Sequence, residues 1–256
     1  MKPAPVIVAA VLAVLSSACV TTTTGGGEKW DRTERADLHT RMGASYQQQG
    51  QVEVAREEFE LALRIEPDNA AANLAMARLQ LQLGQDRKAR SYFARSVRSD
   101  PNGVAARNEY GLFLCNQGEF ADGLEQLTAA LNNPLNRTQF VSLFAAAECR
   151  RKAGNADEAA QLYQQALDIE PDLRPALLQL AVYNFDRGEH MSARAFLERY
   201  FGDGNYTAES LFLAVRNELS LERRDLAENY ARLLRTRFPD SERIGELRGL
   251  FGNRSG

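Results

Sequence analysis

The chain has 256 residues, with 31 Lys and Arg side chains against 34 Asp and Glu, and its formal net charge is −3 at pH 7. No basic excess is available for a phosphate backbone, so we do not expect nucleic acid as a partner. The two histidines, His39 and His190, lie far apart and lack the spacing of metal ligands, so we expect no metal site and no cofactor.

Residues 1–18 predict a secretory signal peptide. Lys2 is the only charge before Glu28, and the run from Val6 to Leu15 consists of Val, Ile, Ala and Leu. A basic start followed by an apolar segment of about ten residues is typical of a signal peptide. The run is too short to span a membrane as a helix, which takes about 20 residues.

The residues that close this run read L-S-S-A-C and end at Cys19. They resemble the lipobox of bacterial lipoproteins, although Ser16 stands where that pattern has Leu. The resemblance implies cleavage after Ala18 and attachment of acyl chains to Cys19, which would anchor the protein firmly. Because Val20 rather than Asp follows, the implied location is the periplasmic face of the outer membrane. The alternative is ordinary cleavage that leaves Cys19 as a free thiol.

Residues 20–27 read V-T-T-T-T-G-G-G, with no charge and no helical period. Such a composition is typical of a flexible linker, so we predict a tether over residues 19–33 and a folded domain over residues 34–251.

A period of 34 residues organises this domain. In the first unit, positions 8, 11, 15, 20, 24, 27 and 32 are Gly43, Tyr46, Gly50, Ala55, Phe59, Ala62 and Pro67. The predicted units are 36–69, 70–103, 104–139, 140–173, 174–207 and 208–241. The third unit has Gly123 in place of Ala and two inserted residues near Asn132–Asn136, and the sixth has Glu222 in place of the turn glycine.

These positions are the signature of tetratricopeptide repeats. Small residues at positions 8 and 20 let two helices cross closely, glycine at position 15 ends the first helix, and proline at position 32 ends the second. One repeat cannot bury its apolar stripe alone, so the repeats must stack. The sequence therefore predicts an all-α, right-handed superhelical stack of six helix-turn-helix repeats with a C-terminal capping helix after Pro239.

No catalytic constellation is apparent. Glu189-His190 lacks the second histidine of a zinc-protease motif, and the chain has no nucleophile elbow and no phosphate loop. Gly202-Asp203-Gly204-Asn205 is read as an enlarged turn between repeats. We therefore expect neither an enzyme nor a small-molecule substrate.

First helices of stacked repeats line a concave groove through positions 2, 5, 9, 12 and 13. These positions are polar in the first repeat and carry Leu, Val and Phe in later ones, which is typical of a surface covered by a partner. The candidate groove residues are Leu74, Arg78, Leu81, Leu112, Phe144, Leu178, Val182, Phe185 and Phe212. The alternative is that the superhelix closes enough for these side chains to pack on one another.

If Cys19 is acylated, Cys115 and Cys149 remain as a candidate disulfide in an oxidising compartment. They fall at positions 12 and 10 of first helices in neighbouring repeats, whose axes pack about 8–10 Å apart. Pairing is feasible at that distance, and the alternative is two buried reduced thiols.

The segment 108–118, which reads N-E-Y-G-L-F-L-C-N-Q-G, resembles the third repeat of the type IV pilus biogenesis and stability lipoproteins, the pilotins of the pilus secretin. The lipobox, the six repeats and Cys149 in the fourth repeat fit the same family. The resemblance implies an outer-membrane lipoprotein that binds secretin subunits and promotes their multimerisation. Alternatives on the same architecture are a lipoprotein of the β-barrel assembly machinery and a periplasmic scaffold or regulator of cell-wall synthesis.

Overall fold

The computed structural model describes residues 31–202 and 204–252; the predicted signal peptide, Cys19 and most of the predicted tether lie outside this range. Within the described residues the regular structure consists of thirteen α-helices and contains no strand. The helices are α1 (Arg32–Gln48), α2 (Val52–Ile65), α3 (Ala70–Gln82), α4 (Asp86–Ser99), α5 (Val104–Asn116), α6 (Phe120–Leu131), α7 (Gln139–Lys152), α8 (Ala156–Ile169), α9 (Arg174–Asp186), α10 (His190–Phe201), α11 (Ala208–Ser220), α12 (Arg224–Arg237) and α13 (Arg243–Gly252).

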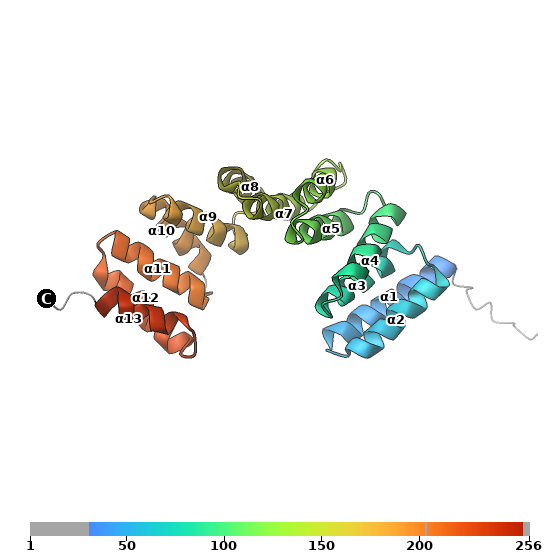
Figure 1. The fold of residues 1–256 in the computed structure, drawn as a ribbon, viewed down its shortest axis with the longest axis horizontal. Coiled ribbons are helices and arrows are strands. Elements are labelled where there is room, and N and C mark those ends of the chain that lie inside the picture. Colours follow the sequence, from blue (N-terminus) through green and yellow to red (C-terminus); the bar gives the residue numbers. More distant parts are fainter. Residues whose placement is uncertain (1–30, 203, 253–256) are drawn as a thin grey trace, which may run out of the picture.

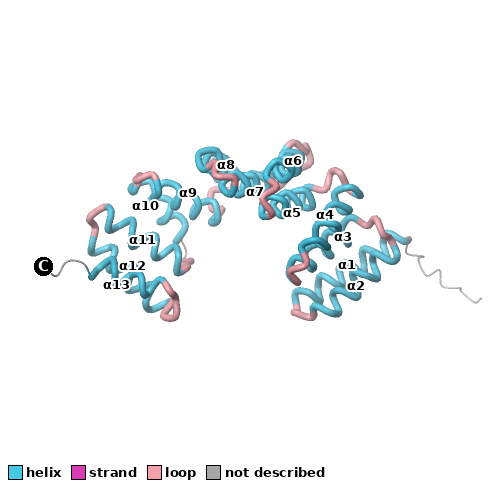
Figure 2. Tube along the Cα trace, in the orientation of Figure 1, coloured by secondary structure: helices cyan, strands magenta, loops and turns pink. Residues whose placement is uncertain are grey.

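Consecutive helices pack as six pairs, from α1 with α2 to α11 with α12, and each pair packs on the next. Figure 1 shows the pairs in an arch that runs from α1 and α2 at one end to α11, α12 and α13 at the other. At the top of the arch α5 and α7 lie on the inner side, whereas α6 and α8 lie on the outer side. Only helices and loops are drawn along the described chain in Figure 2. The predicted all-α stack of helix pairs is confirmed.

The turn inside each pair contains one residue in the left-handed conformation. These residues are Gly50, Gly84, Gly118, Gly154, Gly188 and, in the sixth pair, Glu222. A Cβ at any of the five glycines would meet no atom within 4 Å, so the backbone conformation rather than lack of space favours glycine. Glu222, with φ of 59°, keeps the same turn at a cost of about 1 kcal/mol relative to glycine.

Proline ends four second helices where the repeat pattern predicts it. Helices α2, α4, α8 and α12 each end two residues before a proline, which are Pro67, Pro101, Pro171 and Pro239. Proline disfavours helical conformation in the residue before it and lacks the N–H of a further helical bond.

The first helix begins two residues before the predicted boundary at residue 34. The backbone N–H of Glu34 donates to Asp31 Oδ1 over 2.7 Å, and the Glu34 carboxylate accepts from the Asp31 N–H over 3.0 Å. This reciprocal capping box satisfies two N–H groups and starts α1 at Arg32. The tether prediction is corrected accordingly: residues 31–33 belong to the folded body.

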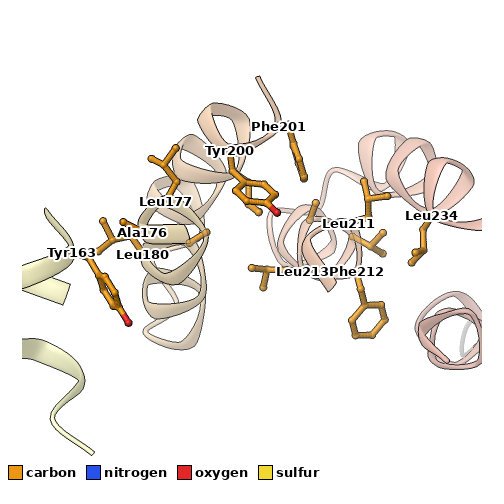
Figure 3. Packing of buried hydrophobic residues seen from close by; sticks show 14 of the residues in the cluster. Tyr163, Ala176, Leu177, Leu180, Tyr200, Phe201, Leu211, Phe212, Leu213 and Leu234 are labelled. Atoms are coloured by element: carbon orange, nitrogen blue, oxygen red, sulfur yellow. The ribbon is translucent and has the colours of Figure 1, made fainter. Parts of the chain in front are cut away.

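Apolar side chains fill the space between pairs rather than one central core. The largest buried cluster joins α7 to α13, and Figure 3 shows part of it around Tyr200, Leu211 and Leu234. Smaller clusters lie between the N-terminal pairs. Each repeat therefore stabilises only its neighbours, as expected for a repeat array. None of the helices in the described part of the chain has the length and apolar character needed to cross a membrane.

Candidate functional site

The inner side of the stack is hollowed between α5 and α7, and we call this hollow the α5–α7 pocket. Its volume is about 420 Å³, and its walls are the N-terminal halves of both helices and the loop 135–138 that precedes α7. The lining residues are Val104, Ala105, Asn108, Glu109, Leu112, Leu135, Asn136, Arg137, Thr138, Val141, Phe144 and Ala145. Most of them are apolar, and the predicted groove residues Leu112 and Phe144 are among them.

The loop that forms one wall of the pocket contains the inserted residues, and Asn136 fixes it. The Asn136 amide is 7% exposed; its Nδ2 donates to Ala130 O and to Ser142 Oγ, both over 3.0 Å. Its Oδ1 accepts from the Thr138 N–H over 2.9 Å. A buried amide with these partners holds the loop in one conformation, so the pocket wall is preformed.

Two apolar side chains of the pocket remain exposed. Leu135, on the inserted loop, is 78% exposed, and Val141, in the first turn of α7, is 41% exposed. Val141 holds groove position 2 of the fourth repeat but was not among the candidate groove residues, whereas Leu135 holds none of the groove positions. The sequence signal for Leu135 was the insertion itself, because extra residues between two regular repeats must form a longer loop at the groove edge.

The candidate groove residues that precede the pocket in the sequence lie in three different environments. Leu74 is partly buried against the cluster that contains Phe93, whereas Leu81 is 37% exposed. Arg78 Nε donates to Glu109 Oε2 over 2.6 Å, so an ion pair crosses from α3 to α5 along the inner side. This hydrogen bond raises the pKa of Arg78 despite partial burial. The charge of Glu109 is therefore already neutralised within the chain.

The candidate groove residues that follow the pocket in the sequence are more buried than the groove prediction implies. Leu178, Val182 and Phe185 are partly buried against the large cluster, and Arg216 lies over the Phe185 ring, 4.6 Å from its centre. Phe212 requires a correction, since it is only 8% exposed. Arg243 of α13 lies 5.2 Å from the centre of its ring, so the capping helix covers this position.

A disulfide joins Cys115 of α5 to Cys149 of α7, with their Cα atoms 5.3 Å apart. Both cysteines are buried, and they lie about one helical turn beyond Leu112 and Ala145 of the pocket. A Cβ at Gly123 would lie 2.3 Å from Cys115 Sγ. The sulfur therefore occupies the space that alanine fills at this position in other repeats. The bond holds α5 and α7 together beneath the pocket.

The carboxylate of Glu148, at groove position 9 of the fourth repeat, is held by its neighbours. Tyr163 Oη donates to Glu148 Oε1, and Arg151 Nη2 donates to Oε2 over 2.8 Å. Burial alone would raise the pKa of Glu148, but the bonds from Arg151 and Tyr163 outweigh it and hold the pKa below its ordinary value. An ionised, fully engaged carboxylate positions side chains and is poorly suited to proton transfer. Within residues 31–202 and 204–252, no three His, Cys, Asp or Glu side chains form a candidate metal site.

Residues 46–108 and 150–205 match the family model of the tetratricopeptide repeat. The fold is therefore an all-helical stack of tetratricopeptide-type repeats. Type IV pilus assembly protein PilF of Pseudomonas aeruginosa is 26% identical to it over 212 residues, covering 82% of this chain and 83% of that protein.

Two solved structures of similar proteins share the fold of this repeat protein. Pseudomonas aeruginosa PilF superposes with a TM-score of 0.77 at 23% identity and covers 85% of this chain and 98% of its own. PilW, a widely conserved type IV pilus biogenesis factor, superposes with a TM-score of 0.77 at 24% identity, covering 83% of this chain and 97% of its own. At this identity the likeness establishes the fold.

Away from the pocket, the repeat protein buries one poorly paired carboxylate. Glu218 of α11 is 2% exposed, and its Oε2 has no hydrogen-bond partner. The nearest cation is Arg194, whose Nε lies 3.6 Å from Glu218 Oε1 and only 2.9 Å from Glu198. Burial raises the pKa of Glu218, against the opposing attraction of Arg194 and Arg223.

Because the folded-state pKa of Glu218 is raised, the ionised carboxylate lowers stability at neutral pH. This penalty is absent below the unfolded pKa of about 4.3 and complete above the folded pKa. We expect Glu218→Gln to increase the free energy of unfolding by about 1 kcal/mol at neutral pH, with the gain shrinking as the pH falls towards about 4. Urea titrations of both proteins across this pH range measure the gain; a gain that does not change with pH would contradict the assignment.

Proposed function

We propose that this protein is an outer-membrane lipoprotein that binds secretin subunits and promotes their localisation and multimerisation in type IV pilus assembly. The α5–α7 pocket carries the proposal, because a preformed apolar hollow with exposed Leu135 and Val141 is the kind of surface that a protein partner covers. The similarity to PilF, a type IV pilus assembly protein, and the pilotin-like segment 108–118 support pilus assembly as the process and the secretin as the partner.

In the proposed mechanism, the groove holds an apolar segment of the secretin subunit and keeps it from aggregating before assembly. An acyl anchor on Cys19 would bring the bound subunit to the outer membrane. Between Cys19 and Arg32 the chain is at most about 45 Å long when extended, so the repeats would remain close to the membrane. Two or more acyl chains hold a protein at a membrane firmly, whereas one holds it marginally.

A deletion strain tests the partner and the anchor together. We expect deletion to abolish secretin multimers while secretin monomer persists, and the wild-type chain to restore them. The Cys19→Ala chain should be found folded in the soluble periplasmic fraction, because the repeats begin beyond the tether.

Three results would contradict the proposal. Secretin multimers that survive deletion would exclude the role in assembly. Cys19→Ala protein that stays in the membrane after a carbonate wash would exclude the anchor. Co-purification of barrel-assembly subunits or peptidoglycan synthases in place of secretin would favour the alternative functions of this architecture.

A further inference from the structure

Of the two charged side chains that line the α5–α7 pocket, only one has an ion-pair partner within the described part of the chain. Glu109, the one acidic residue that lines it, is held by Arg78. Arg137, the one basic residue that lines it, is exposed and forms no ion pair, hydrogen bond or ring contact within the described part of the chain. The uncompensated charge at the pocket is therefore a single guanidinium.

From this asymmetry we infer that the pocket recognises a protein segment in which bulky apolar side chains stand next to an acidic residue. The apolar side chains fill the space between Leu112, Val141 and Phe144, and the carboxylate pairs with Arg137. This inference rests on the proposed function, in which the groove binds a protein segment, and it specifies the chemistry of that segment.

The size and shape of the pocket suit such a segment. A volume of about 420 Å³ falls in the range of about 300–1,000 Å³ found for ligand clefts. The wall with Leu135 is preformed, because Asn136 fixes the loop, so little conformational entropy is lost when a segment binds. An apolar segment that enters can cover the exposed Leu135 and Val141 side chains.

A carboxylate is the group that best matches Arg137. A guanidinium presents its N–H donors in a planar fork that binds both oxygens of a carboxylate. A basic residue of the partner would instead meet Arg137 with like charge, and its attraction to Glu109 is weakened by Arg78. A wholly neutral segment would leave Arg137 unpaired at the edge of a partly desolvated interface.

One further polar group lines the pocket without a partner. Asn108 is 5% exposed, and its Oδ1 forms no hydrogen bond. A buried acceptor of this kind is destabilising until a donor reaches it. The backbone N–H of a bound segment is a suitable donor once the Asn108 amide turns towards the pocket, so Asn108 favours a peptide over a purely apolar ligand.

Selection from a random dodecapeptide library displayed on phage tests this chemistry on the full chain carrying Cys19→Ala. We expect the enriched peptides to carry Asp or Glu within two residues of Leu, Phe, Tyr or Trp. Val141→Ser should lower the affinity for a selected peptide by about tenfold. Arg137→Glu should lower this affinity by a similar factor. A peptide whose acidic residue is replaced by Lys should bind the Arg137→Glu variant but not the protein that keeps Arg137.

A matched control separates this specific effect from overall charge. Arg64→Glu reverses an exposed arginine on α2, far along the stack from the pocket, and should leave peptide binding unchanged. Peptides that bind at the pocket without an acidic preference, or that ignore Arg137→Glu, would overturn the inference and leave the proposed groove in place. If the selected peptides bind the Val141→Ser variant with unchanged affinity, they do not bind at the pocket, and the pocket is then not the proposed binding site.

Discussion

Removing the disulfide between Cys115 and Cys149 is expected to lower the free energy of unfolding by about 3–4 kcal/mol, the largest stability effect that the fold predicts. The two cysteines are 34 residues apart, and closing a loop of that length restricts the unfolded chain by this amount in the chain-entropy model. The cross-link joins the third and fourth repeats beside the insertion, where the register of the stack is least regular. Its loss should therefore destabilise the centre of the array first.

Urea unfolding of the Cys19→Ala chain, with and without Cys115→Ser and Cys149→Ser, measures this effect. Reductant should lower the free energy of unfolding of the parent protein to about that of the double variant, and it should leave the stability of the double variant unchanged. Thiol titration of the denatured, unreduced Cys19→Ala chain should find no free thiol; two free thiols per chain would show that the cysteines are reduced in solution.

Most of the fold was predictable from the sequence because its determinants are local. Each turn depends on one residue at a fixed position, and four of the six second helices end two residues before a proline, so a period of 34 specifies the helix pairs. Even the exception is local: Glu222 adopts the left-handed conformation that the missing glycine would have supplied. The capping box that starts α1 could have been read from Asp31 and Glu34, which have the spacing of that motif.

The site was less predictable because it depends on how neighbouring repeats pack. Repeat positions placed Leu112 and Phe144 on the inner side, where they line the pocket. The same rule also selected Phe212, which α13 covers, since a rule derived from internal repeats does not include a terminal helix. Leu135 lies on an insertion that has no repeat position, so the sequence indicates a longer loop there, and only the structure shows which side chain of that loop lies at the pocket.

The structure also determines which substitutions test binding cleanly. Phe144 packs against Tyr163 with ring centres 5.6 Å apart, and Leu178 packs against the large buried cluster. Replacing either by serine would remove packing as well as a binding contact, so a loss of binding would be ambiguous. Leu135 and Val141 lie at the same pocket but are exposed, and surface substitutions usually change stability by less than about 0.5 kcal/mol.

We therefore expect Leu135→Ser and Val141→Ser each to weaken secretin binding about tenfold while the helical stack remains intact. Burying an aliphatic side chain contributes about 1.5–3 kcal/mol, and about 1.4 kcal/mol corresponds to a tenfold change in affinity. The double variant should bind secretin about a hundredfold more weakly if the two effects add, and coupling between these neighbouring residues would change that factor. Titration of purified secretin subunit against each variant measures the affinity, and circular dichroism and urea unfolding check the fold.

Two sets of control variants distinguish the pocket from apolar exposure in general. Met191→Ser removes a side chain that is 63% exposed on α10, outside the pocket, and should leave binding unchanged. Gln47→Ala and Gln48→Ala alter the polar first repeat and should also have little effect. If Leu135→Ser and Val141→Ser fold normally and still bind secretin with full affinity, the pocket is not the binding site. A loss of binding in Met191→Ser instead would place the interface on α10, away from the pocket.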